Sequence, residues 1–228
     1  MLAFYKLILH NSKGGRYTAP VSKRYDQYCP VAHALGMVGE RWSLLIVREL
    51  MHGPKRYTDL AASLPGIGTN ILAARLKELE SCGLLTRHRL DPPAASQVYE
   101  LTPYGHELKP VMRTLALWGL RSIGPPTEED DLAPGWLYGA LDTVFAPVAP
   151  AGSFEFRIGR EVAGLVDGEA RRGSIEEPDV VVEGGEDAFY WLFVERRWNG
   201  VKVEGDRELL ERLFDAVTAP APDVSVLV

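Results

Sequence analysis

The pattern of apolar and polar residues is most informative over residues 57–104, where it predicts two helices and then two strands. An apolar run over residues 60–64 is typical of a short helix, and Thr58 is the expected N-cap. Pro65 and Gly66 then predict a tight turn, because proline cannot continue a helix and glycine permits the turn.

The second helix has two different faces. Either Thr69 or Asn70 can cap its start, and Gly83 ends it. Leu72, Leu76 and Leu79 recur at helical spacing and are expected to point inward. The opposite face is small and polar, with one cation, so it can approach the edges of DNA bases. Its residues are Thr69, Asn70, Ala73, Ala74 and Lys77.

Residues 84–90 and 97–101 are expected to form two antiparallel strands. The loop between them is too long for a tight hairpin, and Arg87, His88 and Arg89 lead into it, where they can contact phosphate. Helix, turn, helix and hairpin in this order indicate a winged helix-turn-helix, a unit that places one helix in a groove of DNA. An ordinary helical domain with one hairpin is the alternative.

Three further helices are expected around this unit. One spans residues 29–39 with Pro30 in its first turn, and one over residues 40–51 is apolar on most of its circumference and should lie in the core. A third runs from Thr102 to about Ser122 and carries more apolar surface than one small domain can cover. This surplus favours pairing with the same helix of a second subunit.

At this point the sequence resembles the HxlR-type transcriptional regulators, over roughly residues 25–122. The segments that carry the resemblance are Cys29-Pro30-Val31, Gly39-Glu40-Arg41-Trp42-Ser43-Leu44-Leu45-Ile46, Arg56-Tyr57-Thr58-Asp59-Leu60, Leu64-Pro65-Gly66-Ile67, Arg75-Leu76-Lys77-Glu78-Leu79, Gly83-Leu84-Leu85 and Tyr99-Glu100-Leu101-Thr102-Pro103-Tyr104-Gly105.

The resemblance implies a homodimer that binds double-stranded DNA at a pseudo-palindromic operator. The helix from Gly68 would read the major groove and the hairpin would be the wing. Gly68 stands where the family often has serine, a difference that bears on the operator sequence. The expected DNA-binding residues are Gly68, Thr69, Asn70, Ala73, Ala74 and Lys77 on the recognition helix, and Arg56, Arg75, Arg87 and Arg89 for phosphate or the groove at the wing.

The second half begins after a proline-rich and acidic run over residues 124–134, which is typical of a linker. Residues 136–145 suit a helix, and residues 206–217 suit a closing amphipathic helix with acids in its first turn. The expected strands between them are residues 154–158, 161–166, 179–182, 188–194 and 199–203, with Trp191 and Trp198 as sheet residues.

This order is similar to the sterol carrier protein fold, over roughly residues 130–220. The segments that carry the similarity are Phe154-Glu155-Phe156-Arg157-Ile158, Pro178-Asp179-Val180-Val181-Val182 and Gly200-Val201-Lys202-Val203-Glu204-Gly205-Asp206. The similarity implies a site for an apolar ligand between sheet and helices. A solid core that contributes to dimer contacts is the alternative, since apolar side chains at sheet spacing usually form a core.

The two halves of the chain differ in net charge. Residues 1–123 hold 16 Lys and Arg against 9 Asp and Glu, a net of +7, while residues 124–228 hold 9 against 22, a net of −13. A basic half can approach a polyanion that repels the acidic half. No apolar run approaches the roughly 20 residues of a membrane helix. Two cysteines are too few for a disulfide framework, which favours a cytoplasmic protein.

Cys29 is the one candidate for chemistry. It precedes Pro30 at a helix N-terminus, a place that favours the thiolate, so it is a candidate redox sensor; an inert thiol is the alternative. The histidines are scattered and predict no metal site. No phosphate loop or nucleophile motif is present, so neither an enzyme nor a cofactor is expected.

We therefore expect an α+β protein with an N-terminal arm over residues 1–20 without a signal peptide, a winged helix-turn-helix domain over 21–123, a linker over 124–134 and a sterol-carrier-like domain over 135–228. The expected function is that of a cytoplasmic DNA-binding regulator, modulated by an apolar ligand or a thiol. The alternative is a module that binds a lipid or apolar metabolite and uses its winged helix for protein contacts.

Overall fold

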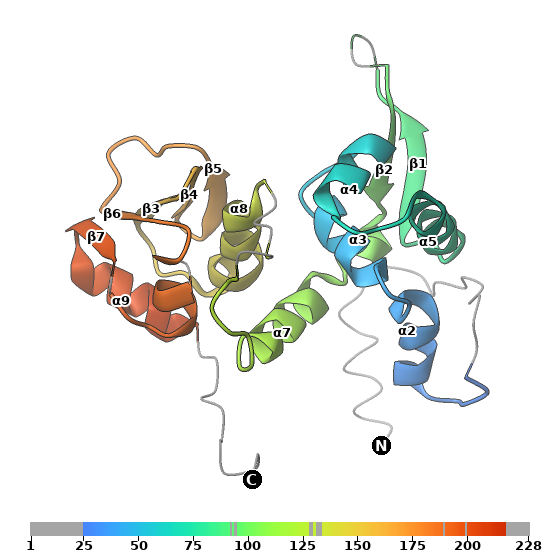
Figure 1. Ribbon diagram of the computed structural model, residues 1–228, viewed down its shortest axis with the longest axis horizontal. Coiled ribbons are helices and arrows are strands. Elements are labelled where there is room, and N and C mark those ends of the chain that lie inside the picture. Colours follow the sequence, from blue (N-terminus) through green and yellow to red (C-terminus); the bar gives the residue numbers. More distant parts are fainter. Residues whose placement is uncertain are drawn as a thin grey trace.

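The computed structural model describes residues 25–217, except residues 92, 94, 128–129, 131–133, 189 and 199. It has a mixed α+β fold in two parts, with helix α7 between them (Figure 1). The elements of the first part are α2 (Pro30–Val38), α3 (Ser43–Leu50), α4 (Tyr57–Ser63), α5 (Thr69–Ser81), β1 (Leu85–Arg89), β2 (Gln97–Leu101), α6 (Pro103–His106) and α7 (Lys109–Gly119). The predicted arm over residues 1–20 lies outside the described residues.

Helices α4 and α5 with the β1–β2 hairpin form the predicted winged helix-turn-helix. Their caps differ from the prediction. The N-cap of α4 is Arg56, whose backbone N–H donates to the Asp59 carboxylate at 3.1 Å, and Thr58 already lies inside the helix. The N-cap of α5 is Gly68, and both Thr69 and Asn70 are helical. The Asp59 carboxylate in the first turn thus accepts from the backbone of the N-cap residue, which is a different bond from the one expected of Thr58.

The core of the first part is built on α3. Ile46, Val47 and Leu50 are fully buried, and they lie in one apolar cluster with the inward face of α5, which includes Leu72, Leu76 and Leu79. The apolar residues of α3 thus hold the second helix of the helix-turn-helix in place, as the sequence predicted.

The helix predicted over residues 102–122 is divided into two. The Thr102 hydroxyl accepts from the backbone N–H of Gly105 at 3.1 Å and caps α6, and a second helix begins at Lys109 with Pro110 in its first turn. A Cβ on Gly105 would lie 2.1 Å from the Leu84 carbonyl oxygen. Only glycine permits this approach, which ties the short helix α6 to the base of the hairpin.

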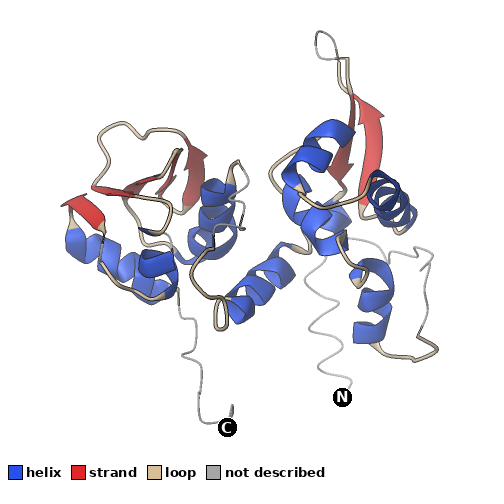
Figure 2. Ribbon diagram, viewed as in Figure 1, coloured by secondary structure: helices blue, strands red, loops and turns tan. Residues whose placement is uncertain are grey.

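The second part contains a five-stranded sheet and helices on one side of it (Figure 2). Its elements are α8 (Trp136–Ala140), the π-helical turn η1 (Leu141–Phe145), the 3₁₀ turn η2 (Ala146–Val148), β3 (Ser153–Ile158), β4 (Glu161–Val166), β5 (Glu169–Arg172), β6 (Val180–Gly184), the π-helical turn η3 (Tyr190–Val194), β7 (Val201–Gly205) and α9 (Arg207–Ala216).

The strand order is β5-β4-β3-β6-β7, and β3 pairs antiparallel with β4 and parallel with β6. Phe154 and Phe156 of β3 are fully buried on the side of the helices, beside Val180 and Val182 of β6. The same cluster contains Phe214 of α9, so this face of the sheet and the helices share one core.

The opposite face of β3 contains a buried carboxylate. Glu155 is 0% exposed, and its Oε1 accepts from Arg157 Nε at 2.6 Å. Its other oxygen accepts from the backbone N–H of Ile175, in the segment that links β5 to β6. A Cβ on Gly164 would lie 2.4 Å from the Ile175 side chain, so this segment lies close against the outer face of the sheet.

The second part differs from the expected strands in two places. Residues 190–194 form a π-helical turn instead of a strand, and its buried Leu192 and Phe193 join the core, so Trp191 is not a sheet residue; Trp198 lies before β7. Strand β5 was not expected, because its sequence Glu-Ala-Arg-Arg has no apolar alternation; it is an edge strand with little burial. The domain boundaries stay predictions.

Candidate nucleic-acid interface

One face of α5 is open and carries the side chains that the sequence assigned to DNA. Leu72, Leu76 and Leu79 anchor the helix on its buried side. The residues on its open side are all exposed: Gly68, Thr69, Asn70, Ala73, Ala74 and Lys77. Short side chains over the first two turns leave the helix backbone accessible to a flat surface such as base edges.

The start of α5 is fixed by two contacts from neighbouring elements. The Tyr57 hydroxyl of α4 donates to the Thr69 carbonyl oxygen at 2.7 Å. Trp42, at the start of α3, has a left-handed backbone with φ of 80°, which is strained for a residue other than glycine. A Cβ on Gly66 would lie 4.0 Å from the Trp42 ring, so this ring borders the turn that leads to α5.

The hairpin presents two exposed arginines, Arg87 and Arg89. The Arg89 Nε donates to the Ala95 carbonyl oxygen at 2.9 Å. Arg87 donates to the Gln97 side chain and lies 5.8 Å from the centre of the Tyr99 ring. Arg56 is also exposed, at the N-cap of α4. Guanidinium groups in such positions are suited to bind phosphate oxygens.

Arg75 differs from the other expected DNA contacts. Its side chain is only 12% exposed, and its guanidinium pairs with Glu40 at 3.1 Å and with Glu78 one turn along the helix. An arginine held by two carboxylates is not free to neutralise phosphate, so we assign it to the packing of α5. The Arg75–Glu78 spacing of three residues was the signal in the sequence.

A partly buried ionic cluster that the sequence did not predict links α3 to the hairpin. Glu49 accepts from Lys55 Nζ at 2.6 Å and from Arg48 at 2.8 Å, and Lys55 also donates to the Ser63 hydroxyl of α4 at 3.3 Å. The backbone of Lys55 bonds in both directions with Tyr99 of β2. Burial acts to raise the pKa of Glu49, but the bonds and charges of Lys55 and Arg48 outweigh it, so the pKa is lowered.

Cys29 occupies the N-cap position of α2 and is half-buried, and its side chain makes no capping hydrogen bond. Cys82 is buried at the end of α5. Within the part of the chain that the structure describes, no three His, Cys, Asp or Glu residues gather in a way that could hold a metal ion. None of the helices in that part is long and apolar enough to cross a membrane.

Helices α4 and α5 followed by the β1–β2 hairpin, with an exposed face on α5, place the chain among the winged helix-turn-helix proteins. The model of the HxlR-like helix-turn-helix family matches residues 37–126. The HTH-type transcriptional regulator YodB of Bacillus subtilis (strain 168) is 36% identical over 91 residues, which are 40% of this chain and 81% of YodB. YvaP of the same organism, an uncharacterized HTH-type transcriptional regulator, is 32% identical over 101 residues, 44% of this chain and 94% of YvaP. The chain belongs to the HxlR-like helix-turn-helix family.

Not every relative is covered to the same extent. Sll1512 of Synechocystis sp. (strain ATCC 27184 / PCC 6803 / Kazusa), an uncharacterized HTH-type transcriptional regulator, is 36% identical over 84 residues, which are 37% of this chain and 62% of that protein. Among solved structures, the reduced form of YodB from B. subtilis is 33% identical, covers 44% of this chain and 100% of YodB, and has a TM-score of 0.38. These matches each cover less than half of this chain.

Proposed function

We propose that the protein is a transcriptional regulator that binds double-stranded DNA through α5. The observation that carries this proposal is the exposed face of that helix. It presents small and polar side chains and, further along, the positive charge of Lys77. The helix would lie in the major groove with Asn70 near base edges, while Arg56, Arg87 and Arg89 hold phosphates. The family and its regulator relatives support this assignment.

We propose that the regulator acts as a homodimer. Helices α2 and α7 expose large apolar side chains, among them Val31 at 66%, Val111 at 51% and Trp118 at 68%. A soluble monomer rarely exposes so many large apolar side chains, and a two-fold pairing would cover them. Two α5 helices would then meet half-sites about one helical turn or a multiple apart.

We assign no catalytic role to the protein and place it in the cytoplasm, with the DNA that it would bind. The sterol-carrier-like part would sense an apolar ligand. The alternative is a module that binds a lipid or apolar metabolite and uses its winged helix for protein contacts. It predicts that no duplex is bound at low salt.

The direct test begins with the full chain and a random pool of duplexes, from which bound sequences are selected. A selected duplex is labelled and titrated by fluorescence anisotropy at several salt concentrations. Lys77→Ala should weaken binding by about tenfold and reduce the slope of log K against log salt by about 0.9. Lys202→Ala, an exposed lysine of β7, is the matched control and should change neither. Failure to select any duplex would disprove the proposal.

A thiol switch is a second element of the proposal, supported by the position of Cys29 at the start of α2. Diamide would take two electrons and two protons as the Cys29 thiol forms a disulfide with a second thiol, and this bond would constrain the start of the helix that carries part of the exposed apolar surface. Diamide should change duplex affinity in the wild type and not in Cys29→Ser. An equal response in both proteins would remove Cys29 from the proposal.

A further inference from the structure

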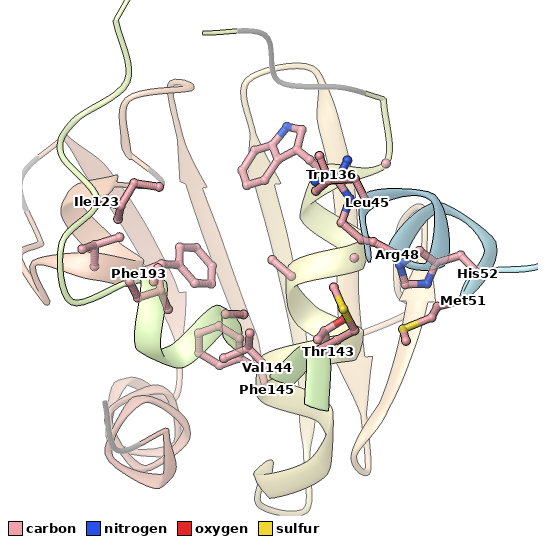
Figure 3. A pocket seen from close by; sticks show the side chains of 18 of the residues that line it. Leu45, Arg48, Met51, His52, Ile123, Trp136, Thr143, Val144, Phe145 and Phe193 are labelled. Carbon is pink, nitrogen blue, oxygen red and sulfur yellow. The ribbon is translucent and has the colours of Figure 1, made fainter. Parts of the chain in front are cut away.

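A large cavity lies between the two parts of the chain, and it touches the helix-turn-helix directly. Its volume is about 1380 Å³. Figure 3 shows Ile123 and Phe193 on one side, Trp136 and Leu45 on the other, and Val144 and Phe145 between them. The walls therefore come from α3, from the segment after α7, and from the helical layer of the second part. Cavities for small ligands commonly hold about 300–1,000 Å³, so this one is large enough for a complete ligand.

The inner wall is apolar and rich in aromatic rings. Phe145, Phe193 and Phe214 lie in edge-on contact with one another, with ring centres 5.1 to 5.6 Å apart, and all three line the cavity. Trp136 is only half-buried on the other side of the space. A wall of this kind is suited to a ligand with an apolar, ring-containing or branched body.

Among the described residues, five cations line the cavity, Arg48, Lys55, Arg121, Arg172 and Arg196, against three carboxylates, Glu49, Glu195 and Asp215, and this excess of positive charge favours an anion. Glu49 is already matched by Lys55 and Arg48. In contrast, Arg121, Arg172 and Arg196 line the cavity and form no ion pair within 4.0 Å with the residues that the structure describes. Burial lowers the pKa of Arg196, although the charge of Asp215 opposes this shift. Its Nη2 donates to the Val217 carbonyl oxygen at 2.8 Å, and its buried Nη1 has no hydrogen-bond partner among the residues that the structure describes.

Arg172 is the best placed of these cations. Its guanidinium lies 4.1 Å from the centre of the Tyr138 ring, and its Nη1 is 3.0 Å from the position that a Cβ on Gly135 would take. Gly135 lines the cavity directly before Trp136. The charge of Arg172 also contributes to lowering the pKa of His52, so its field extends to the α3 wall. A positive charge beside an aromatic wall is suited to a ligand that joins an apolar body to an acid group.

The same cavity is lined by the turn of the helix-turn-helix. Ser63, Leu64 and Pro65 border it, and they form the end of α4 and the start of the turn that leads to α5. Trp42, whose ring borders Gly66, lines it too. A ligand that contacts these residues and the second part at once would favour one relative position of the two, and with it one position of α5.

We propose that this cavity is the effector site of the regulator, and that its ligand is an amphipathic anion with an apolar body and one carboxylate, sulfonate or phosphate group. The body packs between Trp136 and Phe193, and the acid group pairs with Arg172. The ligand changes DNA affinity through the turn before α5. This inference deepens the proposed function and depends on it for the DNA response, but not for ligand binding.

The test of binding uses a pair of dyes with the same ring system. 8-Anilinonaphthalene-1-sulfonate carries the anion and N-phenyl-1-naphthylamine lacks it, and both are titrated into the full chain by fluorescence. Arg172→Gln should weaken binding of the sulfonate by about tenfold and leave the neutral dye unchanged. Arg212→Gln, an exposed arginine of α9 outside the cavity, is the matched control and should alter neither.

A second variant tests the location. Ala140→Phe should fill part of the cavity and weaken both dyes, whereas Ala151→Phe, the same enlargement on an exposed segment, should not. Circular dichroism shows that each variant is folded before it is titrated. Equal binding of the sulfonate to the wild type, Arg172→Gln and Ala140→Phe would overturn the site.

The test of regulation is reciprocal. A saturating concentration of the sulfonate dye should change affinity for the selected duplex by about five- to 150-fold, and the duplex should change dye affinity by the same factor. Ala140→Phe should bind the duplex without responding to the dye. Dye binding in the cavity with no change in duplex affinity would overturn the effector role and leave DNA binding intact. A protein that binds dye but no duplex would instead disprove the proposed function.

Discussion

The imidazole Nδ1 of His52 lies 3.7 Å from the Oδ2 of Asp142, across the contact between α3 and the second part of the chain. The distance is too long for a hydrogen bond, and the buried Nδ1 has no hydrogen-bond partner within the described part of the chain. The His52 ring packs edge-on against Tyr138, with ring centres 5.1 Å apart. Burial lowers the pKa of His52 and outweighs the opposing charges of Asp142 and Glu49, while Arg172 and Lys109 lower it further.

The first prediction concerns pH. Burial lowers the pKa of His52 in the folded protein, so the unfolded chain binds a proton at a higher pH than the folded chain does. The contribution of His52 to stability is therefore complete above its ordinary pKa of 6.5 and is lost as the pH falls through the lower folded value. His52→Gln should flatten the loss of melting temperature between pH 7.5 and 5.5. His106→Gln, an exposed histidine, is the control and should preserve the wild-type slope.

The second prediction concerns the ion pair between the two parts. Lys109 Nζ lies 2.8 Å from Asp142, whose side chain is 17% exposed. Lys109→Met should lower the free energy of unfolding in urea by about 1 kcal/mol, because the Asp142 carboxylate loses this cation while it stays partly buried. Lys202→Met removes a lysine whose partner Glu204 is 60% exposed, and should cost less. Equal losses would show that Asp142 does not depend on Lys109.

The third prediction concerns the hairpin. Arg89→Ala should weaken binding to all duplexes about equally and reduce the salt slope by about 0.9, because an arginine on phosphate carries no sequence information. Asn70→Ala should change the selected sequence instead, since an amide on a base edge discriminates by about 1–3 kcal/mol. The measurement is anisotropy on a panel of single-base variants of the duplex. Arg160→Ala, exposed between β3 and β4, is the control.

The fourth prediction concerns Glu155. Its removal leaves the Ile175 N–H without an acceptor and Arg157 without its carboxylate. Glu155→Ala should lower the free energy of unfolding by about 2–3 kcal/mol. Glu183→Ala removes an exposed carboxylate from the neighbouring strand β6, and a loss as large as that of Glu155→Ala would contradict the importance of burial.

Local patterns in the sequence predicted most of the elements. The spacing of Leu72, Leu76 and Leu79 gave α5, and the alternation over residues 154–158 gave β3, because each pattern reflects burial of one face. The strand predicted over residues 188–194 was wrong because burial there does not distinguish a strand from a helical turn. A short run that is apolar on nearly every position reads as a buried strand or a buried helical turn, and only the packing of Leu192 and Phe193 decides between them.

The sequence likewise predicted one part of the candidate interface and not the rest. The exposure of one face of α5 follows from helical periodicity alone, and the role of its residues in DNA binding stays a prediction. The pairing of Arg75 with Glu40 depends on how α2 and α3 lead to α5. The cavity was not predictable. Its walls come from segments as distant in sequence as Trp42 and Phe214, and a local sequence pattern cannot show that such segments lie close together.

The parallel pairing of β3 with β6 has a consequence for how the chain is synthesised. Strands β3, β4 and β5 are neighbours in sequence and can associate as soon as each is made, but β3 has no second partner until residues 180–184 follow. The first part, complete by residue 119, can acquire its structure on the ribosome well before this. We expect nascent chains released at residue 172 to expose one side of β3 and to be removed by proteases or chaperones, while their winged helix remains intact.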